Sequence, residues 1–261
     1  MYDMNIHTFN VLHICHELNY NKENSFILSK YENENDRIME IFNKIIELFI
    51  NDIVIVCLQE VPHILLEHFK RFSKNDYYLK VYYYKLPRYP KSSYNIYQNN
   101  SEYLVTLIYD KINIDKVYNI EKIQYADYGK AALICIIDTY DICCINTHLP
   151  INNYGGKDAF EFIKDYIDEF DNCILLGDFN KNKKYAMELF KKYNMIDSLQ
   201  TFTESEKYTY KRKLDDGSYI YKSYDHIFIF SYKNKYSLTN TQVIDDEISD
   251  HSLVSTCLQL L

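Results

Sequence analysis

The stretch from Cys173 to Asn180 constrains the fold of this chain more than any other. Four apolar residues run directly into Gly177, and a carboxylate and an amide, Asp178 and Asn180, follow two positions apart. A short apolar run that ends at a turn residue predicts a strand buried on both faces of a sheet, and the glycine allows the backbone to bend sharply there. Because side chains alternate along a strand, we expect Asp178 and Asn180 to project on one side at the mouth of that sheet, where α/β folds tend to place chemistry. An ordinary strand with an Asp/Asn turn is the simpler alternative for this stretch taken alone.

Apolar runs and periodic segments elsewhere predict a mixture of strands and helices. The clearest helix covers residues 33–50, where apolar residues recur at three- and four-residue spacing. Further helices are expected over residues 62–71, 157–170 and 184–193. Strands are expected over residues 5–13, 53–58, 77–84, 103–109, 131–138, 142–147, 173–177, 227–230 and 253–258.

The order of these segments predicts an α/β fold with mixed sheets. Strands alternate with helices early in the chain and follow one another directly in its middle, which favours two packed sheets with helices outside. The sequence contains no Gly/Ser/Pro-rich linker and no internal repeat. We therefore expect residues 1–261 to form a single domain.

The composition is that of a globular protein and not of a disordered one. Hydrophobic residues make up 47% of the chain and charged residues 25%. No apolar run approaches the roughly 20 residues that cross a bilayer, and the N-terminus lacks the basic and apolar regions of a signal peptide. The 7 cysteines mostly lie in apolar, strand-like runs and form no C-x-x-C pair. These features predict an intracellular protein with reduced, buried thiols, no membrane span and no disulfide-linked partner.

The charge distribution contains features for and against binding to nucleic acid. A formal net charge of −8 argues against a broad electrostatic grip on a polyanion. Basic residues nevertheless cluster over residues 181–184, 80–91 and 207–213, and tyrosines are interleaved in the last two groups, an arrangement suited to phosphate contact and base stacking. The alternative is compositional bias, because the chain has 28 Tyr against 5 Gly and no Trp. On the first interpretation, the segments 85–101 and 200–224 contact a bound nucleotide.

Polar residues stand at the ends of many of the predicted strands. They are acids, amides and histidines, namely Asn10, Glu60, His148, Asp178, Asn180, Asp225, His226, Asp250 and His251. Buried strands do not need such residues in order to fold, and each costs free energy if it is desolvated without a partner. Strand ends can converge in a layered fold, so one shared polar site is the simplest explanation. For each residue taken alone, the alternative is a cap, a turn or a satisfied buried polar group.

The composition of this set indicates a hard metal ion. Glu60, Asp250 and Asn10 offer oxygen donors of the kind that Mg²⁺ or Mn²⁺ prefers, and the set contains no thiolate that would favour zinc. Histidines beside carboxylates supply proton transfer near neutral pH. A metal together with acid–base groups is what hydrolysis of a phosphoester requires.

Six of these strand ends, taken in order, resemble a known family. The matching segments are 8–11, 58–61, 146–149, 177–180, 224–227 and 249–251. The chain thus resembles the endonuclease/exonuclease/phosphatase superfamily, whose best-known fold is that of deoxyribonuclease I, over about residues 5–258. The resemblance implies a four-layer α/β/β/α sandwich in which helices flank two packed mixed sheets.

The resemblance also implies roles for individual residues. Glu60 would hold the metal, with Asn10 and Asp250 nearby. Asp178 would orient or deprotonate the attacking water, and Asn180 would position the phosphate or the metal.

The histidines divide into two groups under the same resemblance. His251, paired with Asp225, would contact the scissile phosphate or transfer a proton, and His148 would act from the other side with Glu102 as a possible partner. The remaining histidines that the family pattern does not use are interpreted as surface or structural residues: His13, His16, His63, His68 and His226.

One departure from the pattern narrows the branch of the family. Abasic-site repair members carry an acid two residues after the first Asn, whereas this chain has Leu12 there. The pattern is more similar to the poly(A)-deadenylase and RNA phosphodiesterase branch. The implied function is a divalent-metal-dependent phosphodiesterase, a nuclease acting on RNA or DNA. The alternatives are a phosphoesterase for a phosphoinositide, a sphingolipid or a protein–nucleic acid adduct, and a catalytically silent binding module of the same fold.

Overall fold

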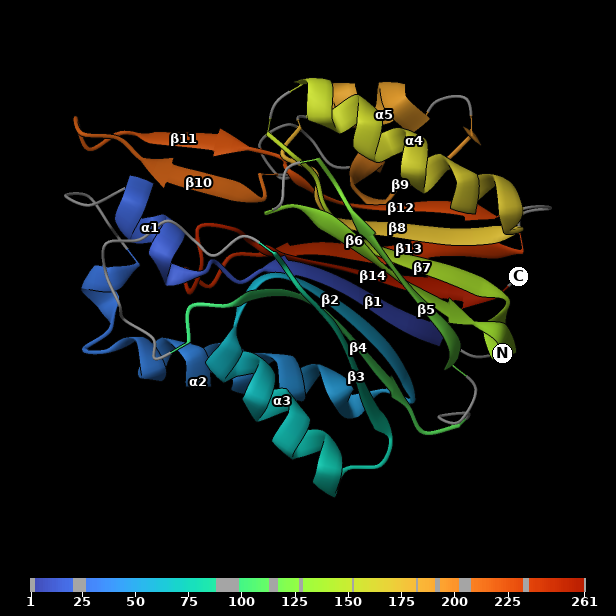
Figure 1. Ribbon diagram of the computed structural model, residues 1–261, viewed down its shortest axis with the longest axis horizontal. Coiled ribbons are helices and arrows are strands. Elements are labelled where there is room, and N and C mark those ends of the chain that lie inside the picture. Colours follow the sequence, from blue (N-terminus) through green and yellow to red (C-terminus); the bar gives the residue numbers. More distant parts are fainter. Residues whose placement is uncertain are drawn as a thin grey trace.

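Two six-stranded mixed sheets form the body of the protein (Figure 1). The structure is a computed structural model that describes residues 3–20, 27–87, 99–112, 117–126, 129–151, 153–181, 183–190, 193–201, 208–231 and 235–260. The first sheet has the strand order β13-β14-β1-β2-β4-β3 and the second the order β5-β6-β7-β8-β12-β9. A separate two-stranded ribbon, β10-β11, extends beyond one end of the sheets (Figure 1).

The strand bounds are as follows. The first sheet consists of β1 (Asp3–Asn10), β2 (Ile53–Pro62), β3 (Leu79–Lys85), β4 (Glu102–Asp110), β13 (Tyr236–Ile244) and β14 (Leu253–Leu260). The second consists of β5 (Val117–Gln124), β6 (Ala131–Ile137), β7 (Ile142–His148), β8 (Asn172–Asp178), β9 (Ile196–Asp197) and β12 (Asp225–Ser231). The ribbon is made of β10 (Tyr210–Lys213) and β11 (Tyr219–Lys222).

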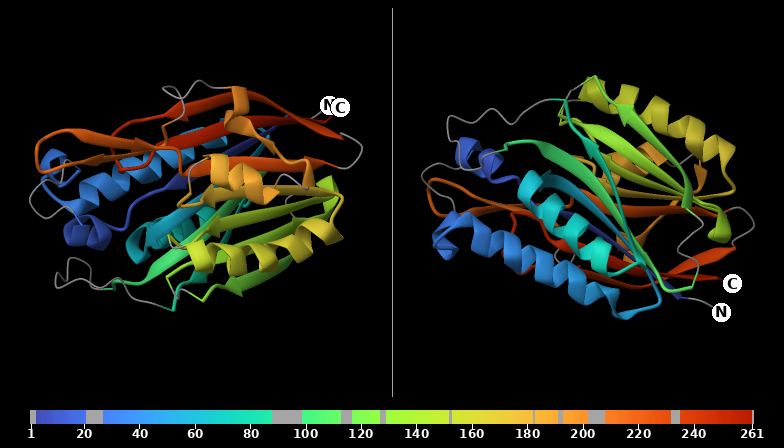
Figure 2. Two further views of the ribbon diagram at one scale, coloured as in Figure 1. Left: turned by 90° about the horizontal axis from the view of Figure 1, so that it is seen from above. Right: turned by 60° about the horizontal axis from the view of Figure 1, so that its bottom comes forward.

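Helices cover the outer face of each sheet, as Figures 1 and 2 show. The α-helices are α1 (Ile14–Tyr20), α2 (Glu34–Glu47), α3 (His63–Asn75), α4 (Asn153–Glu169) and α5 (Lys183–Phe190). Short 3₁₀ turns lie at Leu28–Lys30, Leu48–Ile50, Asp138–Tyr140 and Ser198–Thr201. In α2, the Asn33 side chain caps the first turn by accepting a hydrogen bond from the Asp36 N–H, and Ile38, Ile41 and Ile45 form the buried stripe. No helix within the described ranges is long and apolar enough to span a bilayer.

Three apolar clusters fill the three interfaces between these layers. One lies between the sheets and includes Ile55 of β2 and Leu133 of β6. The second joins the first sheet to α2 and α3, and the third joins the second sheet to α4 and α5. The expectation of an α/β fold with two packed mixed sheets and outer helices is therefore confirmed, as is the four-layer α/β/β/α sandwich that the family resemblance implied.

Each sheet contains one parallel pair of strands, and these two pairs position the polar residues. The parallel pairs are β1–β2 and β7–β8, whereas the other pairings within the two sheets are antiparallel. The helix α2 lies between β1 and β2 in the chain, and α4 lies between β7 and β8, as parallel crossovers require. The carboxyl ends of the four strands carry Asn10, Glu60, His148 and Asp178. Ligand sites in α/β sheets form at such carboxyl ends.

Several elements were missed by the sequence analysis for identifiable reasons. The strands β5 and β13 lie at sheet edges, and their alternating polar residues give little apolar signal. The ribbon β10–β11 is rich in Lys and Tyr and so also lacks an apolar signal; its turn is closed by the Leu214 N–H, which donates to the Ser218 carbonyl, and by the Gly217 N–H, which donates to the Leu214 carbonyl. The 7 cysteines are all free and buried, as expected.

A buried arginine connects α2 to the loops that carry the polar residues. Arg37 is fully buried, and its guanidinium donates to the carbonyl oxygens of Val11, Leu12 and Ile248 over 2.8–2.9 Å. Its remaining N–H groups pair with the Glu34 carboxylate at 2.6 and 2.8 Å. A planar fork with five donors suits this arrangement, which no other side chain reproduces. Arg37 thereby fixes the segment after Asn10 and the segment before Asp250 with respect to each other.

A glycine is required where β8 reaches its last residue. Gly177 has a φ of +143°, and a Cβ built on it would lie 1.8 Å from the Thr147 carbonyl oxygen of β7. Because Thr147 pairs with Gly177 and His148 with Asp178 in the parallel register, any side chain here would push two site residues apart. The expected role of Gly177 was a sharp bend, whereas the structure shows a close approach between neighbouring strands.

Replacing Gly177 by alanine should destabilise the fold by about 3 kcal/mol or more, because the clash is with backbone and cannot be relieved by a rotamer change. Gly217→Ala is the matched control: Gly217 also has a positive φ, of +83°, but no atom lies within 4 Å of a Cβ built there. The control should lose only the left-handed backbone penalty, about 1–2 kcal/mol. Chemical denaturation measures both, and equal losses would refute the packing argument.

Replacing Arg37 by lysine should lower the free energy of unfolding by about 3 kcal/mol, because one ammonium cannot satisfy three buried carbonyls and a carboxylate. Arg71→Lys provides the comparison, since Arg71 is exposed on α3 and the change should stay within about 0.5 kcal/mol. Thermal and denaturant unfolding report the difference. A stability for Arg37→Lys close to that of Arg71→Lys would show that this connection is dispensable.

Candidate active site

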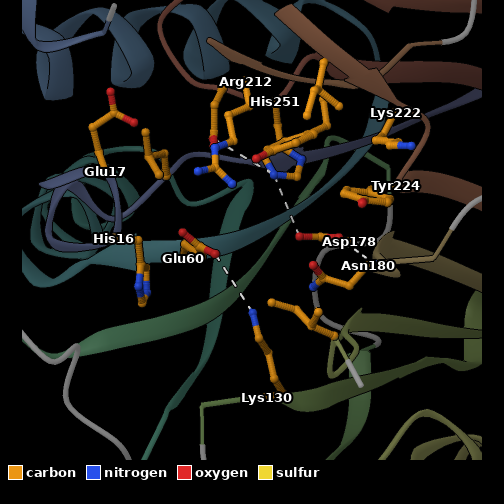
Figure 3. Close-up of a pocket in the computed structure, with 15 residues that line it drawn as sticks. His16, Glu17, Glu60, Lys130, Asp178, Asn180, Arg212, Lys222, Tyr224 and His251 are labelled. Atoms are coloured by element: carbon orange, nitrogen blue, oxygen red, sulfur yellow. Dashed lines mark hydrogen bonds and ion pairs between the residues drawn. The ribbon is translucent and has the colours of Figure 1, made fainter. Parts of the chain in front are cut away.

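A pocket of about 460 Å³ opens where the carboxyl ends of the two parallel pairs meet (Figure 3). Of the residues expected at the site, its lining includes Glu60, Asp178, Asn180, Asp250 and His251. Other residues lining it were not expected there, among them His16, Glu17, Lys130, Tyr210, Arg212, Lys222 and Tyr224. The structure thus gathers groups from both sheets, from α1 and from the ribbon into one cavity.

Asp178 lies at the centre of the hydrogen-bonding network. Its Oδ2 is 3.1 Å from Asn10 Nδ2, 3.2 Å from His148 Nε2 and 3.8 Å from His251 Nε2. Its Oδ1 accepts the Asn180 backbone N–H at 2.7 Å. Burial favours the neutral acid, but the nearby His148, His251 and Lys130 outweigh it and hold the pKa of Asp178 well below its usual range. Asp178 is therefore a charged acceptor at neutral pH.

His251 and Asp225 form a buried imidazole–carboxylate pair. The Nδ1 of His251 is 2.7 Å from Asp225 Oδ2, which directs Nε2 towards Asp178. Thr209 Oγ1 accepts the Asp225 N–H at 2.9 Å and so helps to place the carboxylate. Burial disfavours the imidazolium, but the carboxylates of Asp225, Asp250 and Asp178 raise the pKa of His251 to about 10. The structure therefore supplies a positively charged imidazole with a fixed direction.

Glu60 occupies a strained backbone position in a bulge of β2. Its φ is +55°, and the pairing of β2 with β4 shifts register between Leu58 and Val61. Its Oε2 accepts the His13 N–H at 3.3 Å, while its Oε1 lies 3.8 Å from His148 Nε2 and 4.0 Å from Lys130 Nζ. Burial raises the pKa of Glu60, but the charges of His16, Lys130, His148 and His251 lower it to about 2.

Three of the seven non-glycine residues that have left-handed φ in the described part of the chain line the pocket. Leu12, Glu60 and Asn180 all have left-handed φ values, of 56°, 55° and 49°, and all three line the cavity. Non-glycine residues adopt this conformation at a cost of about 1–3 kcal/mol each and cluster at functional sites. The strain is an independent indication that the geometry here is selected for something other than stability.

Asp250 lies in a strongly acidic environment. Burial, together with the carboxylates of Glu60, Glu17 and Asp178, raises the pKa of Asp250 to about 7 even though His251 opposes the shift. Both its burial and its acidic neighbours therefore disfavour the charged form of Asp250.

The two asparagines make hydrogen bonds that the sequence did not predict. Asn10 donates to Asp178, and its Oδ1 accepts the Leu12 N–H at 3.0 Å, so in this structure it orients a carboxylate. Asn180 does not continue the alternation of β8: the chain turns after Asp178, Phe179 enters the apolar core, and Asn180 Nδ2 donates to the Leu149 carbonyl at 2.9 Å. Asp178 and Asn180 both line the pocket at the mouth of the sheet, as expected, but the strand alternation that was to place them does not extend beyond Asp178, where β8 ends.

Glu102 has a different partner from the one expected. Its Oε2 is 2.8 Å from His16 Nε2, whereas His148 contacts Lys130, Glu60 and Asp178. Because His16 was interpreted as a surface or structural residue, its position in the pocket corrects that interpretation too.

Lys130 lies at the site although the sequence did not predict it, whereas His226 has a structural environment. Lys130 was missed: it directly precedes β6, whose first residue, Ala131, pairs with His148, so its place next to a strand end was the available signal. His226 agrees with its expected structural role, since its ring is fully buried and its nitrogens lie 3.3 Å from Asp197 Oδ2 and 3.1 Å from the Ser223 carbonyl.

No protein-family model matches the sequence, and no curated protein sequence matches it significantly. Comparison with solved structures, in contrast, gives extensive matches. ANGEL2, a 2′,3′-cyclic phosphatase in complex with adenosine-2′,3′-vanadate, superimposes with a TM-score of 0.71 at 13% identity, over 99% of this chain and 96% of that one. The human Nocturnin catalytic domain with bound sulfate gives 0.68 at 15% identity, over 99% and 95%. Zebrafish (D. rerio) TDP2 with a single-strand DNA product gives 0.66 at 14% identity, over 98% and 99%.

These likenesses extend over nearly the whole of each chain, and they agree with the strand order and layers described above. The chain has the deoxyribonuclease I-like fold, the fold of the endonuclease/exonuclease/phosphatase superfamily.

Proposed function

We propose that this protein is a divalent-metal-dependent phosphodiesterase that hydrolyses phosphoester bonds in nucleic acid. The observation that carries the proposal is the pocket itself. Glu60, Asp178 and Asp250 lie in one cavity with the His251–Asp225 pair, while Arg212 and Lys222 line the same cavity. Carboxylates for a cation, a fixed imidazolium and basic side chains for phosphate together suit phosphoryl transfer better than any reaction of an uncharged substrate.

The donor set fits a hard divalent ion. The proposed ligands are the carboxylates of Glu60 and Asp250, with Asn10 beside them and Asp178 adjacent. One ligand atom from each of Glu60, His148 and Asp178 lies within 4.8 Å of the others. Burial and the neighbouring carboxylates raise the pKa of Asp250, and a cation bound beside it would favour its charged form. When bound, Mg²⁺ or Mn²⁺ would supply charge neutralisation at the phosphate oxygens.

The residues of the chain supply the remaining functions. Asp178, kept ionised by its neighbours, accepts a hydrogen bond from the attacking water and directs its lone pair at phosphorus. His251, oriented by Asp225, donates to a non-bridging phosphate oxygen and stabilises the charge that develops there. Lys130, which contacts the His148 ring beside Asp178, adds an ammonium group near the same phosphate.

The β10–β11 ribbon supports a nucleic acid substrate. Tyr210 pairs with Lys222 and Arg212 with Ile220, so these four side chains share one face of the ribbon, and all four line the pocket. The ribbon is held beside the site by backbone hydrogen bonds from Lys211 to the Asp250 carbonyl and from Ser252 to the Thr209 carbonyl, at 2.8 and 2.7 Å.

Aromatic groups next to these cations can stack on a base. The rings of Tyr210 and Tyr224 lie 5.2 Å apart, and Tyr224 also lines the pocket. Proteins of the same fold have been solved with an adenosine-2′,3′-vanadate and with a single-strand DNA product, which supports a nucleotide in this position. The expected contacts from residues 88–98 and 202–207 lie outside the described part of the chain.

Incubation of the purified protein with labelled single-stranded RNA and DNA should give cleavage that requires Mg²⁺ or Mn²⁺ and that EDTA abolishes. Glu60→Gln and Asp178→Asn should each lower kcat/KM by about 10³-fold or more, because each removes a charge from the centre of the site without changing its size.

Glu161→Gln is the matched control, since Glu161 is an exposed residue of α4 that pairs with Lys164 on the surface. It should retain the parent rate. Metal-independent cleavage, or a Glu60→Gln variant as active as the control, would refute the proposed function.

Metal affinity should depend on pH around neutrality. Because the pKa of Asp250 is raised to about 7, the proton competes with the cation below that pH, and the Kd for Mn²⁺ should rise about tenfold for each pH unit below 7. Above pH 7 the Kd should level off. Titration calorimetry measures the profile, and Asp250→Asn should bind more weakly with a flatter pH dependence. A parent profile that is flat between pH 5.5 and 7 would contradict this assignment.

A further inference from the structure

A second imidazole–carboxylate pair lies in the pocket and has no place in the mechanism above. His16 Nε2 is 2.8 Å from Glu102 Oε2, a separation close to the 2.7 Å of the His251–Asp225 pair. Glu102 is buried at the start of β4, and His16 is mostly buried but lines the cavity from α1. The two pairs come from different elements and were not linked by any sequence motif.

The two pairs stand on different sides of the proposed metal ligand. Figure 3 shows His16 on one side of Glu60 and Asp178, with His251, on the other. Among the charged neighbours, His16 lowers the pKa of Glu60 most. The pKa of Asp178 is instead lowered by His148, His251 and Lys130. His16 therefore adjoins the carboxylate at the centre of the pocket from the side that the water-directing group does not occupy.

In a displacement at phosphorus, a group opposite the attacking water lies beside the leaving oxygen. The attacking and leaving oxygens lie roughly in line on opposite sides of the phosphorus atom. If Asp178 directs water from one side, the leaving oxygen departs on the other, and a nucleoside alkoxide is a poor leaving group unless it gains a proton. A proton donor on that side would therefore increase the rate.

We propose that His16, whose Nε2 is held by Glu102, donates the proton on its Nδ1 to the leaving-group oxygen. The inference rests on the proposed function. In the reaction, the water oxygen forms a bond to phosphorus while the bond from phosphorus to the leaving oxygen breaks. The electron pair of the broken bond takes the proton from His16 to give an alcohol, and the proton released by the water passes to Asp178 and then to solvent. His16 regains its proton from solvent.

The surroundings of His16 suit such a role. It faces the carboxylates of Glu60 and Glu102, and it faces positive or titratable groups at Lys130 and His13. Burial disfavours the imidazolium, but the two carboxylates prevail and raise the pKa of His16 to about 9. Glu102 is not a proposed metal ligand, so its carboxylate stays beside Nε2 and favours the protonated imidazole when a cation is bound at Glu60.

The experiment compares two substrates that differ in their leaving group. One is a short oligonucleotide, whose leaving group is a nucleoside alkoxide, and the other is bis(p-nitrophenyl) phosphate, whose nitrophenolate leaves readily without a proton. His16→Gln, assayed at saturating Mn²⁺, should lower kcat on the oligonucleotide by about 10²-fold or more. On the nitrophenyl diester it should change kcat only slightly. A loss of folding or of metal would lower both rates alike, so the contrast between substrates isolates the proton transfer.

Two further variants sharpen the result. Glu102→Gln should show the same contrast at smaller size, because His16 keeps its proton-donating nitrogen but loses its orienting carboxylate. His63→Gln is the matched control, since His63 is a half-buried histidine whose Nδ1 lies 3.2 Å from the Tyr103 hydroxyl; it should alter neither rate.

Equal losses on both substrates for His16→Gln would overturn the inference and leave the proposed function standing. Failure of the parent protein to cleave either substrate with Mn²⁺ would instead reject the proposed function, and this inference with it.

Discussion

The structure depends on the mutual neutralisation of ionisable groups that have been taken out of water. Asp178, Asp225, Glu102 and Glu60 are all buried at strand ends, and an isolated carboxylate in such a place would cost several kcal/mol. Each has an imidazole or an ammonium group close by. Asp178 has His148 and His251 within 4 Å, and Lys130 contacts His148. Removing any one partner would leave another charge uncompensated.

Asp250 is a mostly buried acid whose surroundings disfavour its charged form. Burial, followed by the negative charges of Glu60, Glu17 and Asp178, raises the pKa of Asp250 to about 7. A site built only for stability would not retain such a group. The buried carboxylates, together with left-handed backbone at Glu60 and Asn180, support the proposal that the pocket binds a cation.

The same local arrangement in both sheets places these groups in the pocket. A parallel pair with a helical crossover ends in polar side chains, and the adjacent antiparallel strand begins next to them: Asp225 opens β12 beside β8, and His251 precedes β14 beside β1. The two sheets pack so that both sets of ends meet. The packing has strict local requirements, such as the absence of a Cβ at Gly177 and the carbonyl contacts of Arg37.

Much of this organisation was predictable from the sequence because it depends on apolar runs. Buried strands such as β2 and β8 and the periodic stripe of α2 are local patterns, and the polar residues at their ends are visible directly. Pairings between distant residues were not predictable. Glu102 and His16 are separated by 86 positions, and the sequence contains nothing that favours His16 over His148 as the partner of Glu102. The roles of Lys130 and Arg212 depend on where β6 and the ribbon lie in space, and the polar edge strands β5 and β13 carry too little apolar signal.

The central claim is that acids from both sheets meet around one divalent cation. Anomalous diffraction from crystals soaked in Mn²⁺ tests it most directly. The account predicts an anomalous peak inside the pocket, within coordination distance of carboxylate oxygens of Glu60 and Asp250. An ion bound only elsewhere on the molecule, or an empty pocket at saturating Mn²⁺, would contradict it.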